Sequence, residues 1–549
     1  GTAYELIGDN EHALKAVLGT YSYMSGDRGY GIRLNLYFPM GTDECMNPSE
    51  NNDNGRRSIS RYETLPSNTE LNSPDAANRP FAVIYKGIEM ANICIENIPK
   101  MKTFGTSVET KRLYGEALTL RANYYLELIR NWGDVPGVFK PAAFTALSEP
   151  YPQKMDRDLI YEQLIADLQI AESNVPWRTE VAADERITKG AVKALRARIA
   201  LYRAGYGLRR SPVDIVKGSN ALAYYTIARD ECREIMARPD QHDLAPNIKT
   251  LFKNYVCGIK TPNDPTGELM FQVAMAGGSG AADSKMGYAC GPRQQASVGS
   301  TTFNGNAFVL IHPTAFYQFD SVDMRRDVSV APYDLAYDGV TKVGQKLVAL
   351  RDGKFRKDWI TPISTTGTPQ YFGVNWPLIR FSDVLLMFAE AENEINGAPT
   401  ADAIAAFEKV RKRGFLGHES EIGVTPTSKT GFFDAIVKER LLEFMGEGFR
   451  KYDLNRWGIL KEKIQETKDN LLKMRDGLAP YNKVPKYVYY RNNSTGDDFS
   501  IIANSLYNLG PTGTITGQTR VNWISVSDFQ QKIDRFAFDF NYKKDELLP

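Results

Sequence analysis

The sequence has 549 residues, 42% of them hydrophobic and 24% charged, a balance typical of a soluble globular protein with a sizeable core. The formal net charge of +1 provides no field for recruiting nucleic acid or an anionic membrane surface. No apolar run approaches the ~20 residues that cross a bilayer. The five scattered cysteines, an odd number without a CxxC pair, argue against a disulfide framework.

Helical periodicity dominates two parts of the chain. After a first helix near His12 to Met24, apolar residues recur at helical spacing over 81–98, 113–132, 156–173, 188–205 and 221–237, and again over 381–396 and 401–413. Small residues in these helices allow close packing of neighbours. We expect four helix pairs of the tetratricopeptide kind, near 81–132, 156–205, 221–252 and 380–414, with an insertion at 207–220 that blurs the repeat.

Two long stretches lack this periodicity. Residues 41–80 are polar and irregular, and residues 253–379 are rich in Gly, Ser, Asn and aromatics. Both are too long for simple connectors, so we predict a functional surface loop and an inserted lobe of loops and short hairpins. A third irregular segment closes the chain over 474–549.

The stretch KERLLEFMGEGFRKYDLNRWG at 438–458 places Glu439, Glu443 and Glu447 one helical turn apart, where like charges repel. We predict a structural network of ion pairs in which Arg440 reaches Glu443, and Arg450 and Lys451 reach Glu447. A catalytic role for these carboxylates is the alternative. We also assign Arg121, Arg380 and Glu390 to the architecture.

The sequence contains few of the motifs that are typical of enzymes. The four histidines, His12, His242, His312 and His418, lack zinc-ligand spacing, and no P-loop, GxGxxG or complete GxSxG is present. A glycosidase needs only two carboxylates, so acid chemistry stays open as an alternative. We expect no cofactor and no metal.

Three motifs resemble the signatures of the SusD/RagB family, the surface lipoproteins of Bacteroidetes nutrient-uptake systems. They are GEALTLRANYYLELIRNWGDVP at 115–136, RFSDVLLMFAEA at 380–391, and the Glu-Arg, Glu, Glu-Gly, Arg, Asp-Leu, Arg-Trp-Gly order within 438–458. Asp323 to Asp327 and Thr42-Asp43-Glu44 are similar to shorter family motifs. The chain ends in Glu546-Leu547-Leu548-Pro549, where family members commonly continue.

The resemblance implies a mainly α fold. It consists of a tetratricopeptide-like scaffold, with units near 81–252 and 380–458, and a loop-rich subdomain, all in one domain over 1–549. It also implies a non-enzymatic lipoprotein on the outer cell surface that captures a glycan and passes it to a SusC-like TonB-dependent transporter. A lipid anchor would lie upstream of Gly1. Alternatives are a peptide-binding member of the same family, a tetratricopeptide protein scaffold and an all-helical glycosidase.

Sugar rings offer an apolar face to a flat aromatic ring and a rim of hydroxyls to polar side chains. We therefore expect the ligand to contact aromatic, amide and guanidinium groups of the two loop regions. The candidates are Asn54, Arg56, Arg57 and Tyr62 in the first loop, and Tyr288, Arg293, Gln294, Trp359, Asn375 and Trp376 in the lobe.

Overall fold

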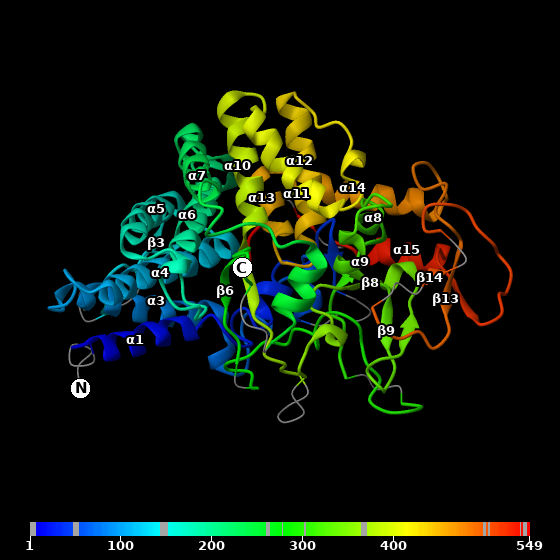
Figure 1. The fold of residues 1–549 in the computed structure, drawn as a ribbon, viewed down its shortest axis with the longest axis horizontal. Coiled ribbons are helices and arrows are strands. Elements are labelled where there is room, and N and C mark those ends of the chain that lie inside the picture. The colour runs from blue at the N-terminus through cyan, green and yellow to red at the C-terminus, as the bar shows by residue number, and fades with distance from the viewer. Residues whose placement is uncertain are drawn as a thin grey trace.

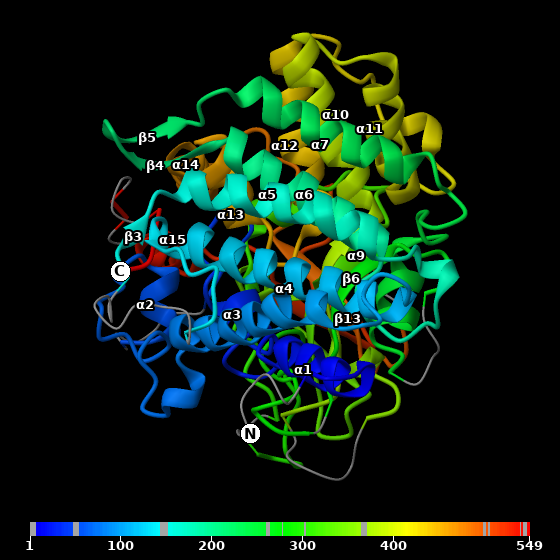
Figure 2. The same ribbon diagram turned by 90° about the vertical axis from the view of Figure 1, so that its left-hand side faces the viewer.

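The long helices of the computed structural model form one continuous stack (Figures 1 and 2). The structure describes residues 7–47, 54–142, 152–259, 264–276, 278–300, 304–363, 370–497, 501–502, 505–537, 540–541 and 546–549. Neighbouring helices of the stack pack on one another in chain order. They are α1 (Asn10–Ser22), α3 (Pro80–Asn97), α4 (Val108–Trp132), α5 (Arg157–Asn174), α6 (Lys189–Ala204), α7 (Ala221–Met236), α10 (Phe381–Asn396), α11 (Ala401–Gly414) and α12 (Lys429–Phe444).

Local chemistry sets the limits and the packing of α4. The hydroxyl of Ser107 caps its start by accepting a hydrogen bond from the amide of Thr110 at 3.2 Å, and Gly133 ends it with a φ of 75°. A Cβ at Gly87 of α3 would lie 2.6 Å from the ring of Tyr124, so glycine allows α3 and α4 to approach closely. The predicted mainly α, tetratricopeptide-like scaffold is confirmed.

One predicted helix pair is wrong. The segment 221–252 contains α7 but no second α-helix, because the chain enters a π-helical turn at Thr250–Val256. Instead, α7 packs directly against α10, which follows the whole of 253–379 in the sequence. That segment, which we call the lobe, is therefore inserted between two adjacent helices of the stack and lies on its lower side in Figure 1.

The lobe is built from short strands and turns. Its strands β6 (Leu269–Val273) and β12 (Trp376–Arg380) pair antiparallel at its root. A four-stranded sheet of order β1-β7-β11-β8 joins β1 (Cys45–Met46) of the first loop to the lobe, with Cys45 opposite Ile311. The remaining lobe elements are β7 (Leu310–Ile311), α8 (Pro313–Phe316), α9 (Arg325–Ser329), β8 (Val330–Ala331), β9 (Tyr333–Leu335), β10 (Lys342–Gly344) and β11 (Arg351–Asp352).

Smaller elements complete the fold. The insertion at 207–220 is a hairpin, and the C-terminal segment wraps back with a three-stranded sheet and a last helix. These elements are β2 (Val135–Pro136), β3 (Lys154–Met155), β4 (Tyr206–Arg210), β5 (Val213–Lys217), α2 (Arg56–Ser60), α13 (Arg450–Trp457), α14 (Leu460–Arg475), β13 (Tyr487–Arg491), β14 (Ile501–Ile502), β15 (Gln518–Asn522) and α15 (Val526–Arg535). All five cysteines are buried and carry free thiols. Within the described chain, no helix is long and apolar enough to span a membrane.

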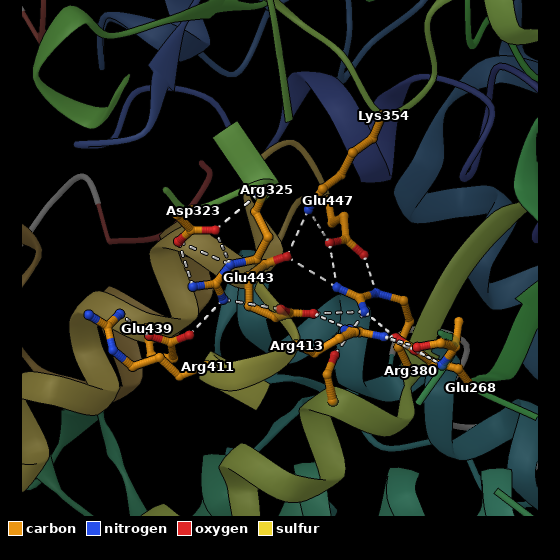
Figure 3. Close-up of polar contacts among 12 residues, drawn as sticks. Glu268, Asp323, Arg325, Lys354, Arg380, Arg411, Arg413, Glu439, Glu443 and Glu447 are labelled. Atoms are coloured by element: carbon orange, nitrogen blue, oxygen red, sulfur yellow. Dashed lines mark hydrogen bonds and ion pairs between the residues drawn. The ribbon is translucent and has the colours of Figure 1, made fainter. Parts of the chain in front are cut away.

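A buried ion-pair network joins the stack to the lobe (Figure 3). Glu443 of α12 lies 3.2, 3.0 and 2.9 Å from nitrogens of Arg325, Arg380 and Arg413. Arg380 also reaches Glu447 at 2.7 Å. Burial raises the pKa of Glu443, but the three guanidiniums outweigh it and hold that pKa well below its usual range. Five carboxylates balance five cations: Glu268, Asp323, Glu439, Glu443 and Glu447 with Arg325, Lys354, Arg380, Arg411 and Arg413.

A second balanced network surrounds Arg440, which lies 2.6 Å from Asp383 and 2.7 Å from Asp453. Its other described members are Arg198, Glu390 and Arg456. The predicted structural role of these charges fits both networks, since all their members except Arg411 are buried.

The local pairings that we predicted are nevertheless wrong. Arg440 does not bind Glu443, Arg450 binds Asp43 at 2.8 Å, and Lys451 donates to the backbone oxygen of Phe38 at 3.0 Å. Helical spacing predicts only partners that are close in the sequence, whereas Arg450 and Lys451 bind residues that are distant in the sequence.

Replacing Glu443 with Gln leaves three buried guanidiniums short of one negative charge. Because breaking one partner of a buried ion pair costs roughly 3–5 kcal/mol, we expect E443Q to lower the free energy of unfolding by about that amount. Chemical denaturation at pH 7 measures the loss. The exposed Glu462 of α14 supplies the control E462Q, which should change stability by less than about 0.5 kcal/mol. A loss of under ~1 kcal/mol in E443Q would contradict the structural role of the network.

Glu44, directly before β1, is buried and accepts a hydrogen bond from the amide of Gly446 at 2.9 Å. Burial raises its pKa to about 7. A carboxyl whose pKa is higher in the folded than in the unfolded chain contributes stability at low pH, and this stability is lost as the pH rises from about 4.5 to 7.

We therefore expect E44Q to gain stability relative to the wild type between pH 5 and pH 8, by roughly 1–3 kcal/mol. Urea titrations of both proteins at the two pH values measure this change. Any pH-independent cost of the Gln side chain is the same at both pH values and therefore cancels. The carboxyl of Asp352, whose pKa burial raises to about 6, is present in both proteins and cancels as well. An equal stability difference at both pH values would refute the assignment.

Candidate functional site

The first loop and the lobe meet at the aromatic ring of Phe308. The guanidinium of Arg56, at the start of α2, lies 3.8 Å from the centre of this ring, a cation–π contact. The amide of Asn47, directly after β1, donates to the backbone oxygen of Phe308 at 2.8 Å. The ring of Tyr37 packs against Phe308 from the protein interior. These contacts bring a residue of the first loop beside the lobe.

Three more of the predicted residues lie next to this contact. The amide of Asn306 donates to the hydroxyl of Tyr288 at 2.7 Å, and Nε of Arg293 donates to the backbone oxygen of Asn306 at 3.2 Å. Gln294 follows directly, and its amide donates to the backbone oxygen of Tyr337 at 3.2 Å. We call this group the loop face and define it as Arg56, Tyr288, Arg293, Gln294, Phe308 and Tyr337.

The loop face is open to solvent and has a rigid base. Arg56, Tyr288, Arg293, Gln294 and Phe308 are half-buried, and Tyr337 is 51% exposed. Under them, Asp334 accepts from the amide of Arg293 at 3.0 Å and forms a two-pronged ion pair with Arg351 at 3.0 and 3.2 Å. Arg351 lies in β11, so the face is anchored to the sheet that also holds β1.

Three predicted ligand residues lie in the core instead. Tyr62, Trp359 and Trp376 are each only 3% exposed, so none offers a ring face to a ligand. The hydroxyl of Tyr62 donates to the backbone oxygen of Gly41, and Trp376 stacks on Phe355 with 5.1 Å between ring centres. Trp359 is covered by the guanidinium of Arg356 at 3.8 Å. Burying a large aromatic ring is energetically favourable, so these three side chains lie in the core although their segments are short and irregular.

The other three predicted residues are not part of the loop face. Arg57 is half-buried beside Arg56 in α2, and Asn54 is exposed and donates to Ser67 at 3.1 Å within the first loop. Asn375 lies away from the loop face and donates to Glu185 at 2.7 Å.

Sequence reasoning missed Phe308 and Tyr337. Tyr337 directly precedes Asp338-Gly339, a hairpin signal that would have placed it at the exposed tip between β9 and β10. Nothing in the sequence around Phe308 identifies its contact with Arg56, because the two residues are far apart in the chain.

The loop face suits binding rather than catalysis. Its side chains supply aromatic surface, hydroxyl, amide and guanidinium groups, whereas its carboxylate neighbour Asp334 is held by Arg351. In the described part of the chain, one group of acidic side chains could hold a metal ion: Glu172, Glu231 and Glu234. This group lies on α5 and α7 of the stack, and the ammonium of Lys193 lies 3.5 and 3.7 Å from the first two carboxylates.

Comparison with known proteins agrees with the fold. The model of the SusD family matches residues 353–505, and the model described as starch-binding associating with outer membrane matches residues 36–201. The chain is also similar to SusD-like protein P25 of Formosa agariphila, with 24% identity over 510 residues, which cover 86% of this chain and 87% of that protein.

Two solved structures share the fold. A SusD homolog from Bacteroides thetaiotaomicron is 25% identical, covers 85% of this chain and 90% of its own, and superposes with a TM-score of 0.75. A laminarin binding SusD-like protein is 24% identical, with coverage of 84% and 94% and a TM-score of 0.64. Family models, relatives and fold therefore agree, and the chain belongs to the SusD/RagB family.

Proposed function

We propose that this protein binds a glycan at the loop face and delivers it to a TonB-dependent transporter of the outer membrane. The observation that carries the proposal is the gathering of Arg56, Tyr288, Arg293, Gln294 and Tyr337 around Phe308 on one rigid, open surface. The similarity to a laminarin binding SusD-like protein and the family description as starch-binding support the same ligand class.

The chemistry of the loop face suits a sugar chain. The exposed ring of Tyr337 can stack on the apolar face of a sugar ring, while the amide of Gln294 and the guanidinium of Arg56 can hydrogen-bond to its hydroxyls. Among the described residues, Arg56 makes no ion pair, and its half-buried guanidinium lies over the ring of Phe308. The site is shallow, so we expect one or two sugar units of a longer chain to be held there.

The helix stack then serves as the scaffold that faces the transporter. The proposed location is the outer cell surface. The family description, which associates such proteins with the outer membrane, supports this placement. We infer that the protein binds its ligand without cleaving it, because Asp334 is engaged by Arg351 and Asp338 accepts hydrogen bonds from Thr341.

Removing the ring of Tyr337 should weaken binding without affecting the fold. An aromatic contact of this kind contributes about 0.5–1.5 kcal/mol, so we expect Y337A to raise the Kd for the glycan by roughly three- to tenfold. Isothermal titration with the oligosaccharide that binds the wild type measures this change. Tyr206, an exposed tyrosine on the β4–β5 hairpin, supplies the control Y206A, which should bind like the wild type. Equal affinities for Y337A and wild type would exclude Tyr337 from the site.

The ligand class and the absence of cleavage can be tested together. Titration calorimetry against a panel of plant and host oligosaccharides, followed by chromatography of each sugar, should show binding with the sugar recovered intact. Cleaved sugar would establish a glycosidase instead. Binding confined to peptides in a parallel panel would place the protein among peptide-uptake members of the family.

A further inference from the structure

A cavity separate from the loop face opens at the root of the lobe, beside the first turn of α6. Its volume is about 280 Å³. Its walls come from 178–188, between α5 and α6, and from 264–272, which enters β6, while His242 closes one side. No loop-face residue lines it. This volume lies just below the usual range for small-molecule sites, about 300–1,000 Å³, and suits one sugar-sized unit.

The basic side chains of the cavity are already engaged. Arg186 lies 3.1 Å from Glu116 and 3.0 Å from Glu109, and Nη2 of Arg178 donates to the backbone oxygens of Asp264 and Pro265. Within the described chain Arg178 has no carboxylate partner, but this one guanidinium faces three carboxylates of the lining, those of Asp184, Glu185 and Asp264. An anionic ligand would also meet the carboxylates of the wall, so the lining disfavours it.

His242 closes the cavity on the side of α6 with a buried ring. Its ring is 1% exposed, and Nδ1 lies 2.7 Å from the backbone oxygen of Gly267. A carbonyl oxygen can only accept, so Nδ1 carries the proton and Nε2 is the acceptor. Nε2 has no hydrogen-bond partner within the part of the chain that the structure describes. A Cβ at Gly190 would lie 2.0 Å from Nε2, so this nitrogen packs against α6 and is closed to a ligand.

Glu185 supplies an exposed acceptor at the cavity, in a strained backbone. Its φ of 65° is in the left-handed region, which non-glycine residues adopt at an energetic cost that is often found at functional sites. The amide of Asn375 donates to Oε1 of Glu185 at 2.7 Å and fixes the side chain. Its second oxygen, Oε2, has no partner among the described residues. Asn375, one of the residues predicted to touch ligand, thus positions a group of this cavity.

We propose that this cavity is a second carbohydrate site, which takes one neutral sugar unit. Sugar hydroxyls can donate to Oε2 of Glu185, which lines the cavity. They can also accept from the hydroxyl of Thr188 and the amide of Gln272, both in the lining. An ammonium ligand donates but cannot accept, and a carboxylate only accepts, so each would satisfy half of the lining. The argument uses no loop-face residue and does not rest on the function proposed for that face.

The variant E185G tests the site. Glycine adopts a φ of 65° without strain, so E185G should keep or raise the Tm while it removes the acceptor. We expect saturation-transfer NMR with maltose, cellobiose and laminaribiose to detect at least one of these disaccharides on Y337A, whose loop face is impaired. This signal should fall at least fivefold in the double variant Y337A/E185G. A crystal soaked in the same sugar should show a hydroxyl about 3 Å from the carboxylate of Glu185.

Control variants separate this site from the loop face and from simple loss of structure. N375A should weaken the same signal, since it releases Glu185, and Y206A should leave it unchanged. A purely structural role of Glu185 predicts a lower Tm in E185G with sugar binding intact, which would overturn the proposal. It would also be overturned if soaked sugar occupied only the loop face, or if the cavity bound ethanolamine or acetate but none of the three disaccharides.

Discussion

The buried network around Glu443 is the constraint on which the rest of the molecule depends. Its charges come from α9, from the starts of β6 and α10, from the ends of α11 and α12, and from the turn after β11. Removing five carboxylates and five cations from water is costly, and only complete pairing offsets that cost. Complete pairing requires the lobe and the stack to dock in one way, so the network stabilises one arrangement of the two parts.

This docking also fixes the loop face. Arg450 binds Asp43, and the amide of Gly446 donates to Glu44, so the segment after α12 holds the strand that leads into the first loop. β1 then pairs with β7, and Phe308 lies two residues before β7. The segment after α12 thus positions β1, β1 pairs with β7, and this pairing places Phe308 beside Arg56. A binding surface made of loops can be rigid when each loop is tied to a buried sheet.

How much of this could be read from the sequence depends on the range of the interactions. The long helices follow from local periodicity and caps, and the observed ends of α4 and α6 lie within a few residues of those predicted. The ion pairs of Arg440 and Arg450 do not follow from local spacing. Helical spacing suggests Glu443 and Glu447 as their partners, whereas in the structure the partners are Asp383, Asp453 and Asp43. Aromatic residues pose the same problem. Tyr288 and Trp376 are equally attractive as sugar platforms, yet Trp376 is buried in the fold, where its ring stacks on Phe355.

The insertion of the lobe between α7 and α10 explains why a binding function can be placed there without weakening the scaffold. These helices pack on each other directly, so the stack is continuous whatever the lobe contains. At the root of the lobe, β6 and β12 pair antiparallel and lead from one helix to the next. Both proposed sites depend on this arrangement. The loop face lies on the lobe itself, and the cavity beside α6 takes Leu269, Met270 and Gln272 from β6 and is braced by Asn375, directly before β12. Changes in the distal turns of the lobe would therefore alter the loop face while leaving the cavity at its root intact.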